Sequence, residues 1–173
     1  MPLRTDSFDL GALRLSSGEG RRLELTVVID PFVLGGESYP VEPRQVPVRL
    51  DISRTTGDGY ALRLRFEATL SGPCMRCLEH AEPTYSVDAR EVSQPGETDE
   101  LASPYVQHGV LDLRQWSRDA FALALPAKLL CRPDCAGLCA ICGADLNVAG
   151  AEHRHDREPD PRWAKLSELR FDG

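Results

Sequence analysis

Hydrophobic and polar residues alternate along much of the first half of the chain, as they do in β-strands with one buried face. The longest run lies between Tyr60 and Leu70, where every second residue is apolar and the residues between them are mostly charged. Similar alternation occupies residues 21–29, 45–52 and 83–92. Consecutive strands of this kind predict a curved antiparallel meander.

Proline and glycine interrupt this pattern at several places. Pro47 lacks the amide hydrogen that a strand ladder uses, so its strand is predicted to lie at a sheet edge or to begin near this residue. Residues 30–40, which read DPFVLGGESYP, are predicted to form a loop because of their glycine and proline content. Residues 93–104 are predicted to form an acidic loop.

The apolar spacing changes to that of a helix after Asp112. Asp112 is placed as an N-cap ahead of residues 113–125, and Pro126 is expected to end the helix. A second, terminal helix is predicted over residues 160–170, with Asp160 as its cap. The face of the first helix that is expected to cover the sheet consists of Leu113, Trp116, Ala120, Leu123 and Ala124.

All six cysteines and two of the four histidines lie in short groups with the spacing of zinc ligands. Two of these groups are C-x2-C knuckles, and a third pair of cysteines has three residues between its members. The two histidines stand two positions apart, so they point the same way if that piece of chain is extended. The candidate metal ligands are Cys74, Cys77, Cys131, Cys135, Cys139, Cys142, His153 and His155.

Eight ligands are enough for two tetrahedral Zn²⁺ sites, and the spacing allows two ways of grouping them. The preferred assignment places Cys74, Cys77, Cys131 and Cys135 around one ion, and Cys139, Cys142, His153 and His155 around the other. A zinc-ribbon pairing instead joins Cys74 and Cys77 to Cys139 and Cys142, with Cys131 and Cys135 spare or joined by the histidines.

These elements predict a single α+β domain over residues 1–173. It consists of a curved antiparallel β-meander that is covered by one helix, followed by a zinc-binding C-terminal section. Within the domain, residues 1–22 are expected to form an extended arm, residues 23–125 the sheet and its helix, and residues 126–173 the Cys/His-rich section and the terminal helix.

Charge and hydropathy restrict the environment and the partners. The net charge of −7 argues against a protein that coats nucleic acid non-specifically, and it suits a basic protein partner better. No apolar run approaches the length of a membrane span, and the N-terminal residues lack the apolar core of a signal peptide. The chain is therefore expected to be cytoplasmic, where reduced cysteines are metal ligands more often than disulfide partners.

Enzyme signatures do not fit this arrangement of cysteines. The run Pro73-Cys74-Met75-Arg76-Cys77 has the form of half of a zinc deaminase motif, but no histidine precedes His80 to complete it. A redox C-x2-C would begin a helix, whereas Cys74 lies between two strand patterns. A catalytic zinc needs an open coordination position, which eight protein ligands do not leave.

Three stretches together resemble the YceD family: the C-x-R-C-L-E knuckle from Cys74, the motif C-R-x-D-C-x-G-L-C-x2-C-G-x-D-L-N from Cys131 to Asn147, and the closing D-P-R-W-A-K-L. Members of this family are small bacterial and plastid proteins named for accumulation of 23S ribosomal RNA. Many relatives carry C-x-C where this chain has His153-Arg154-His155, and that exchange keeps two zinc-type ligands.

The resemblance implies a non-enzymatic factor in biogenesis of the large ribosomal subunit. Its expected partners are the large-subunit precursor, through rRNA or through a basic ribosomal protein, and no membrane. The two zinc ions are expected to be structural. Two other functions stay open: a zinc-dependent protein-interaction module without an rRNA role, and a redox or metal-dependent enzyme.

Overall fold

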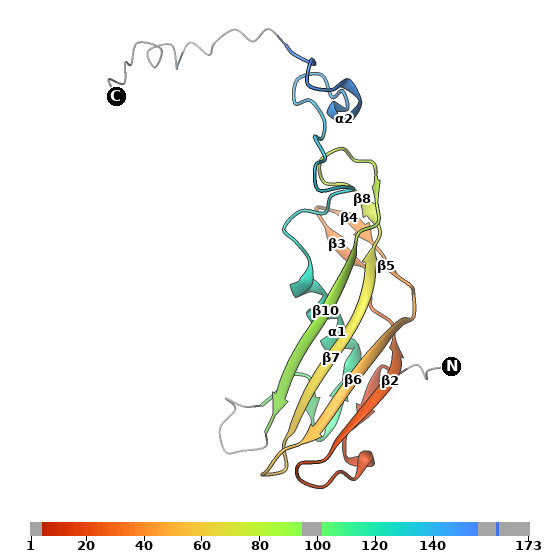
Figure 1. Cartoon of the computed structure of the whole chain (residues 1–173), viewed down its shortest axis with the longest axis vertical. Coiled ribbons are helices and arrows are strands. Elements are labelled where there is room, and N and C mark those ends of the chain that lie inside the picture. Colours follow the sequence, from red (N-terminus) through yellow and green to blue (C-terminus); the bar gives the residue numbers. More distant parts are fainter. Residues whose placement is uncertain (1–4, 95–101, 156–161, 163–173) are drawn as a thin grey trace.

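The computed structural model describes residues 5–94, 102–155 and 162, and it shows an elongated α+β molecule that is built mainly from antiparallel strands (Figure 1). The strands are β1 (Ser7–Asp9), β2 (Gly20–Val27), β3 (Phe32–Leu34), β4 (Glu37–Tyr39), β5 (Val41–Glu42), β6 (Val46–Arg54), β7 (Tyr60–Leu70), β8 (Gly72–Pro73), β9 (His80–Ala81), β10 (Thr84–Ser93), β11 (Val106–Gln107) and β12 (Val110–Asp112). The helices are η1 (Gly11–Leu13, a 3-10 turn), α1 (Leu113–Ala124) and α2 (Leu146–Ala149).

The main sheet contains four long strands in the order β10-β7-β6-β2, and β5 pairs with β7 beside them. Every second residue of β6 and β7 is buried, which confirms the alternation predicted for both strands. The predicted meander is therefore present, although three smaller sheets accompany it in the described part of the chain. One of these pairs β1 with β12 and β12 with β11, and it brings Leu10 into the core.

Residues 30–40, predicted to be a loop, instead contain the β3–β4 hairpin. Gly35 and Gly36 form its two-residue turn, and both have positive φ angles, of 62° and 91°. Such a turn fits the twist of a hairpin, and glycine adopts these angles without strain. Phe32 and Tyr39 face each other across the hairpin and are buried, so the segment contributes to the core.

The strand with the proline is not at an edge, because β6 lies between β2 and β7. The other half of that prediction is confirmed, since Pro47 is the second residue of β6. Its pairing with β7 begins only at Val48, so the missing amide hydrogen costs the β6–β7 ladder nothing.

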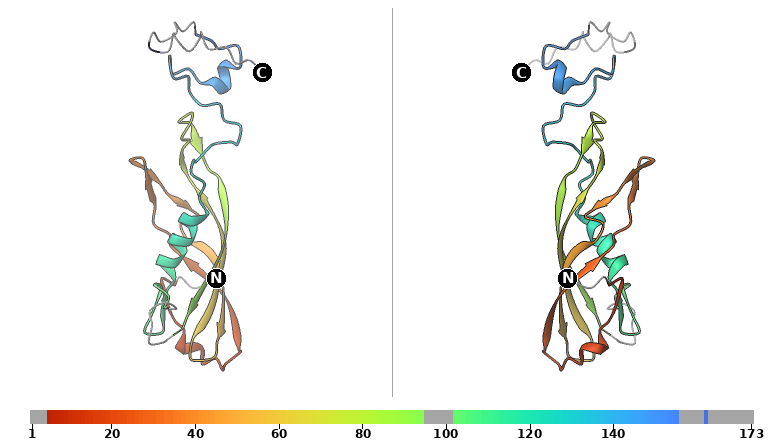
Figure 2. Two further views of the ribbon diagram at one scale, coloured as in Figure 1. Left: turned by 90° about the vertical axis from the view of Figure 1, so that its left-hand side faces the viewer. Right: turned by 90° about the vertical axis from the view of Figure 1, so that its right-hand side faces the viewer.

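Helix α1 covers one face of the main sheet (Figure 2). Its cap is as predicted, because the Asp112 carboxylate accepts a hydrogen bond from the Gln115 amide at 2.9 Å. The predicted buried face is wrong at Leu123, whose side chain is 88% exposed. Phe121 takes the central position instead, and its ring lies beside those of Phe32, Phe66 and Tyr85.

Two predicted segments fall outside the described residues: the centre of the acidic loop, at 95–101, and the terminal helix at 160–170 apart from Arg162. Among the residues that are described, no helix combines the length and the apolar character needed to span a bilayer.

Candidate metal centres

The candidate ligands gather at one end of the elongated molecule, where the β8–β9 hairpin meets the chain from 126 to 155 (Figure 1). Cys74 and Cys77 occupy the turn of this hairpin, as the sequence predicts for a knuckle between two strands. The turn closes through two backbone hydrogen bonds, from the Cys74 amide to the Glu79 carbonyl at 2.7 Å and from the Leu78 amide to the Cys74 carbonyl at 3.0 Å.

The first group of ligands, named site 1, consists of Cys74, Cys77, Cys131 and Cys135. The sulfurs of Cys74 and Cys135 are 3.8 Å apart, those of Cys77 and Cys131 are 3.6 Å apart, and all four lie within 4.8 Å of one another. A Zn–S bond of about 2.3 Å places the sulfurs of a tetrahedral site about 3.8 Å apart. A disulfide would bring two of them to about 2.05 Å. The donor set and its spacing therefore fit one tetrahedral Zn²⁺ ion.

Hydrogen bonds to backbone carbonyls hold the two halves of site 1 together, although the two halves are far apart in the sequence. The Met75 amide donates to the Leu129 carbonyl at 2.8 Å, and the Arg76 guanidinium donates to the Cys135 carbonyl at 2.7 Å. Gly137 has a φ of +79°, and a Cβ placed there would lie 3.1 Å from the Arg76 carbonyl oxygen. Glycine at this position allows the cysteine-rich chain to lie directly against the knuckle.

Nearby backbone amides stabilise the thiolate form of Cys74 in site 1. Burial opposes ionisation of Cys74, but hydrogen bonds from the amides of Cys77, Arg76 and Cys131 outweigh it and lower the pKa of the Cys74 thiol to about 6. Burial raises the pKa of Cys77 to about 12, with further contributions from the neighbouring thiols. One negative charge is thus accommodated without a cation, and a divalent ion would be needed to ionise all four sulfurs.

The second group of ligands, named site 2, consists of Cys139, Cys142, His153 and His155. The Cys142 sulfur lies 3.3 Å from Nε2 of His153, and the Nε2 atoms of His153 and His155 are 2.9 Å apart. As a group its members are more exposed than those of site 1, and Cys142 and His155 are exposed at the surface. Two thiols and two imidazoles form the Cys₂His₂ donor set that Zn²⁺ commonly takes.

The second knuckle repeats the geometry of the first. Hydrogen bonds from the Cys142 and Ile141 amides lower the pKa of Cys139 to about 6. In both knuckles the stabilised thiolate is therefore the first cysteine, and its donors are the amides two and three residues later. Gly143 follows with a φ of +74°, an angle that glycine adopts without strain.

A hydrogen-bond network around Asn147 joins the two sites. Asn147 belongs to α2, inside the loop of site 2, yet its side-chain nitrogen lies 3.6 Å from the Cys135 sulfur of site 1. Its side-chain oxygen accepts hydrogen bonds from the Ala136 amide at 2.8 Å and from the Arg132 guanidinium at 2.7 Å. Side chains that hydrogen-bond to a metal ligand orient it and tune its affinity for the ion.

Replacing Asn147 by alanine is expected to weaken zinc retention at site 1 by about tenfold, because outer contacts of this kind usually contribute tenfold to a hundredfold to metal affinity. The measurement is the rate of zinc transfer from purified protein to a colorimetric chelator. Val148→Ala is a matched control, because the adjacent side chain is exposed. Equal transfer rates for both variants and the unaltered protein would contradict this role.

The spatial grouping of the ligands is that of the preferred assignment. The zinc-ribbon alternative needs Cys139 and Cys142 beside Cys74 and Cys77, and these two pairs lie in different groups. His80 and His108 belong to neither group; His80 lies 2.8 Å from a carboxylate oxygen of Glu82. That either group binds metal stays a prediction.

Asn147 and Arg76 were not singled out from the sequence, and they stabilise site 1 through hydrogen bonds that no spacing rule reveals. A signal for Asn147 existed, since it closes the longest motif of the family resemblance.

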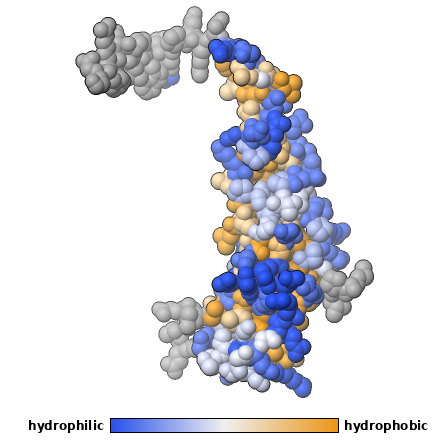
Figure 3. All heavy atoms as spheres, in the orientation of Figure 1, coloured by the Kyte–Doolittle hydropathy of each residue, from blue (hydrophilic) through white to orange (hydrophobic). Residues whose placement is uncertain are grey.

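The end of the molecule that holds the candidate metal sites carries exposed apolar side chains at Ile141 and Val148. On the face seen in Figure 3, hydrophobic residues gather there among mostly hydrophilic surroundings.

Comparison with known proteins places these features in a family. Residues 62–170 match the family model described as "Large ribosomal RNA subunit accumulation protein YceD". A Mycobacterium leprae protein is 35% identical over 134 residues, which cover 71% of this chain and 59% of that protein. Proteins of Mycobacterium bovis and Mycobacterium tuberculosis are each 32% identical over 166 residues, covering 90% of this chain and 78% of theirs.

All three relatives carry the name "uncharacterized protein". No solved structure matches the chain significantly. The family match includes most of β7, both knuckles and α1, and it extends over more than half of the sequence. The chain therefore belongs to the YceD family of large ribosomal RNA subunit accumulation proteins.

Proposed function

We propose that this protein is a cytoplasmic, non-enzymatic factor that supports accumulation of 23S rRNA and assembly of the large ribosomal subunit. The observation that carries this proposal is the family match, which covers most of β7, all of β10, the helix α1 and both groups of candidate metal ligands. The family description supplies the process, accumulation of large-subunit rRNA, and the proposal extends that process to this chain.

The metal is proposed to be zinc, two ions per chain, in structural roles. Site 1 offers four thiolates and site 2 two thiolates with two imidazoles, so each ion would have its four positions filled by protein. Closed coordination leaves no position for a substrate or an activated water, and this supports a structural role over a catalytic one.

A zinc ion would have a structural role at this end of the molecule. The buried apolar cluster around site 1 contains Ala81 and three of the cysteines, with Leu130 and Leu138 packed against it. Such a small cluster gains little from the hydrophobic effect, at roughly 25 cal/mol per Å² of buried apolar surface. Metal bonds would therefore supply most of the free energy that holds residues 126–155 against the hairpin.

The charge of the protein favours a basic partner. With a net charge of −7, direct binding to bulk RNA would be weak at physiological salt, because phosphate contacts depend on an excess of lysine and arginine. A ribosomal protein within the large-subunit precursor fits this charge better.

Depleting the protein in its own host is expected to reduce large subunits relative to small subunits and to lower the ratio of 23S to 16S rRNA. The measurements are a sucrose-gradient profile and quantification of both rRNAs. Complementation with the unaltered gene should restore the ratio, and the Cys74→Ser/Cys135→Ser gene should not. Normal subunit ratios after full depletion would contradict the proposal and favour an interaction module without an rRNA role.

A further inference from the structure

The strand β10 leaves one edge of the main sheet open. It pairs with β7 along its whole length, from Thr84 opposite Thr69 to Ser93 opposite Tyr60. It is the last strand in the sheet order, and no strand in the described part of the chain pairs with its other side. Proteins usually block an edge of this length, because its free N–H and C=O groups can pair with another chain.

The register identifies which backbone groups face the open edge. The Leu70 amide donates to the Pro83 carbonyl at 3.0 Å, so Pro83 directs its carbonyl toward β7. In an antiparallel pair, successive residues direct their backbone groups to opposite sides. Tyr85 and every second residue after it therefore bond to β7, and the residues that face outward are Thr84, Ser86, Asp88, Arg90 and Val92.

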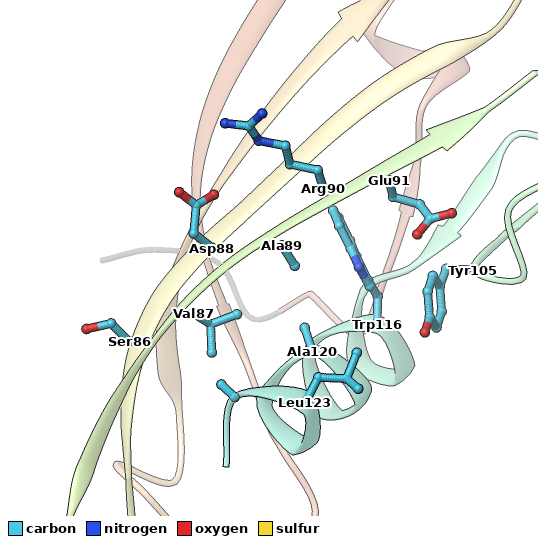
Figure 4. Close-up of a pocket in the computed structure, with 11 residues that line it drawn as sticks. Ser86, Val87, Asp88, Ala89, Arg90, Glu91, Tyr105, Trp116, Ala120 and Leu123 are labelled. Carbon is cyan, nitrogen blue, oxygen red and sulfur yellow. The ribbon is translucent and has the colours of Figure 1, made fainter. Parts of the chain in front are cut away.

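A groove of about 380 Å³ runs beside this edge, between β10 and α1. Figure 4 shows Val87 and Ala89 directed from the strand toward the helix, where Trp116, Ala120 and Leu123 lie. Leu123, which is 88% exposed, is a large apolar side chain of α1 that the core does not use. A strand added to β10 would direct every second side chain into this apolar groove.

The groove is acidic at the end where Tyr105 lies. The Tyr105 hydroxyl donates to an Asp119 carboxylate oxygen at 3.4 Å, and Glu91 lies on the same side of β10 (Figure 4). Burial and these two carboxylates raise the pKa of Tyr105. Asp88 and Arg90 point to the other face of the sheet, and Asp88 is held there by the Arg63 guanidinium at 2.7 Å. Asp119 also lies 3.9 Å from the Arg118 guanidinium, so Glu91 is the carboxylate that the groove itself offers to an occupant. A basic side chain would complement it.

We propose that the open edge of β10 binds an extended basic segment of a partner protein, which adds a strand to the sheet. Most of its groove-facing side chains would be apolar, and one groove-facing lysine or arginine would pair with Glu91. Main-chain hydrogen bonds to the outward groups of β10 would supply affinity, and the groove would supply selectivity. This surface lies on the sheet and helix, away from the metal ligands, so the inference stands apart from the proposed rRNA role.

The test uses the full-length, zinc-loaded protein and a fluorescein-labelled synthetic nonapeptide whose odd-numbered residues would face the groove. These are valine at the three inner positions and lysine at both ends, so that either strand direction places a lysine beside Glu91, and threonine fills the positions between them. Binding is measured by fluorescence anisotropy. Arg90→Pro removes an outward amide without breaking a bond to β7, and the proline ring also obstructs an added strand. We expect it to weaken binding at least tenfold. Arg90→Ala, the matched control, keeps the amide and should bind within a factor of two of the unaltered protein.

Two further peptides test the same idea on the unaltered protein, so the result does not depend on how the proline variant folds. A nonapeptide N-methylated at alternate residues should lose binding, because it cannot donate to β10. A peptide with glutamate in place of lysine should bind at least tenfold more weakly. Circular dichroism and thermal unfolding confirm that the variants are folded.

Several results would overturn the proposal. They are absence of binding to the unaltered protein, equal binding by folded Arg90→Pro, and equal binding of the N-methylated peptide. Light scattering that shows a dimer for the unaltered protein and a monomer for Arg90→Pro would assign the edge to a second copy of this chain instead.

Discussion

Replacing Cys135 by serine is expected to lower the zinc content of the purified protein from about two ions per chain to about one. Cys135 is fully buried, and its sulfur lies 3.8 Å from that of Cys74, so serine would leave site 1 with three thiolates. Structural zinc contributes on the order of 10–16 kcal/mol of apparent binding free energy in small metal-dependent units. The substitution would therefore remove most of the free energy that holds residues 126–155 against the β8–β9 hairpin. Metal analysis by mass spectrometry measures the stoichiometry.

Limited proteolysis distinguishes this local loss from global unfolding. The core of the sheet and helix forms a separate cluster from the one around site 1, so far-UV circular dichroism should keep its strand signal. Cleavage should appear within residues 126–155. Cys142→Ser is the matched control. It should also lose one ion, at the more exposed site 2, but residues 126–138, which contain Cys131 and Cys135, should stay protected from cleavage. Retention of both ions by Cys135→Ser would contradict the assignment of site 1.

Replacing Phe121 by alanine is expected to lower the free energy of unfolding by about 3–5 kcal/mol, the usual cost of removing a buried phenylalanine. Its ring is fully buried, 5.9 Å from that of Phe32 and 6.1 Å from that of Phe66, so it links α1 to the β3–β4 hairpin and to the sheet. Urea denaturation followed by circular dichroism measures the change.

Leu123→Ala in the same helix provides the control for Phe121→Ala. Because Leu123 is 88% exposed, its loss should change the free energy of unfolding by less than about 0.5 kcal/mol. Similar costs for the two substitutions would mean that the helix packs on a different face from the one described.

The long strands and the start of the helix could be predicted because each has a strong local cause. The alternation of β6 and β7 survives in the fold, and the Asp112 carboxylate caps α1 where the sequence places it. The buried face of α1 was harder to predict. Leu123 and Phe121 are two residues apart and both apolar. The hairpin that contributes Phe32 and the sheet strands that contribute Phe66 and Tyr85 decide which one is buried.

The eight residues that gather into two possible metal sites could be predicted from their spacing, and the preferred grouping agrees with the structure, but the spacing did not exclude the alternative. Cys74 and Cys77 have the same spacing relative to one another as Cys139 and Cys142, so pattern alone cannot tell which pair shares an ion with Cys131. The grouping depends on contacts between distant segments, such as the Arg76 guanidinium that donates to the Cys135 carbonyl.

The direct continuation of β7 and β10 into the β8–β9 hairpin has a consequence for assembly of the molecule. Ten registered pairs join β7 to β10, and the hairpin that carries Cys74 and Cys77 follows from their ends. A slip of one residue would turn the buried side chains of β10 outward and displace the knuckle from Cys131 and Cys135. Four thiolates could then no longer bind one ion. Metal binding at site 1 would therefore require the correct register between β7 and β10.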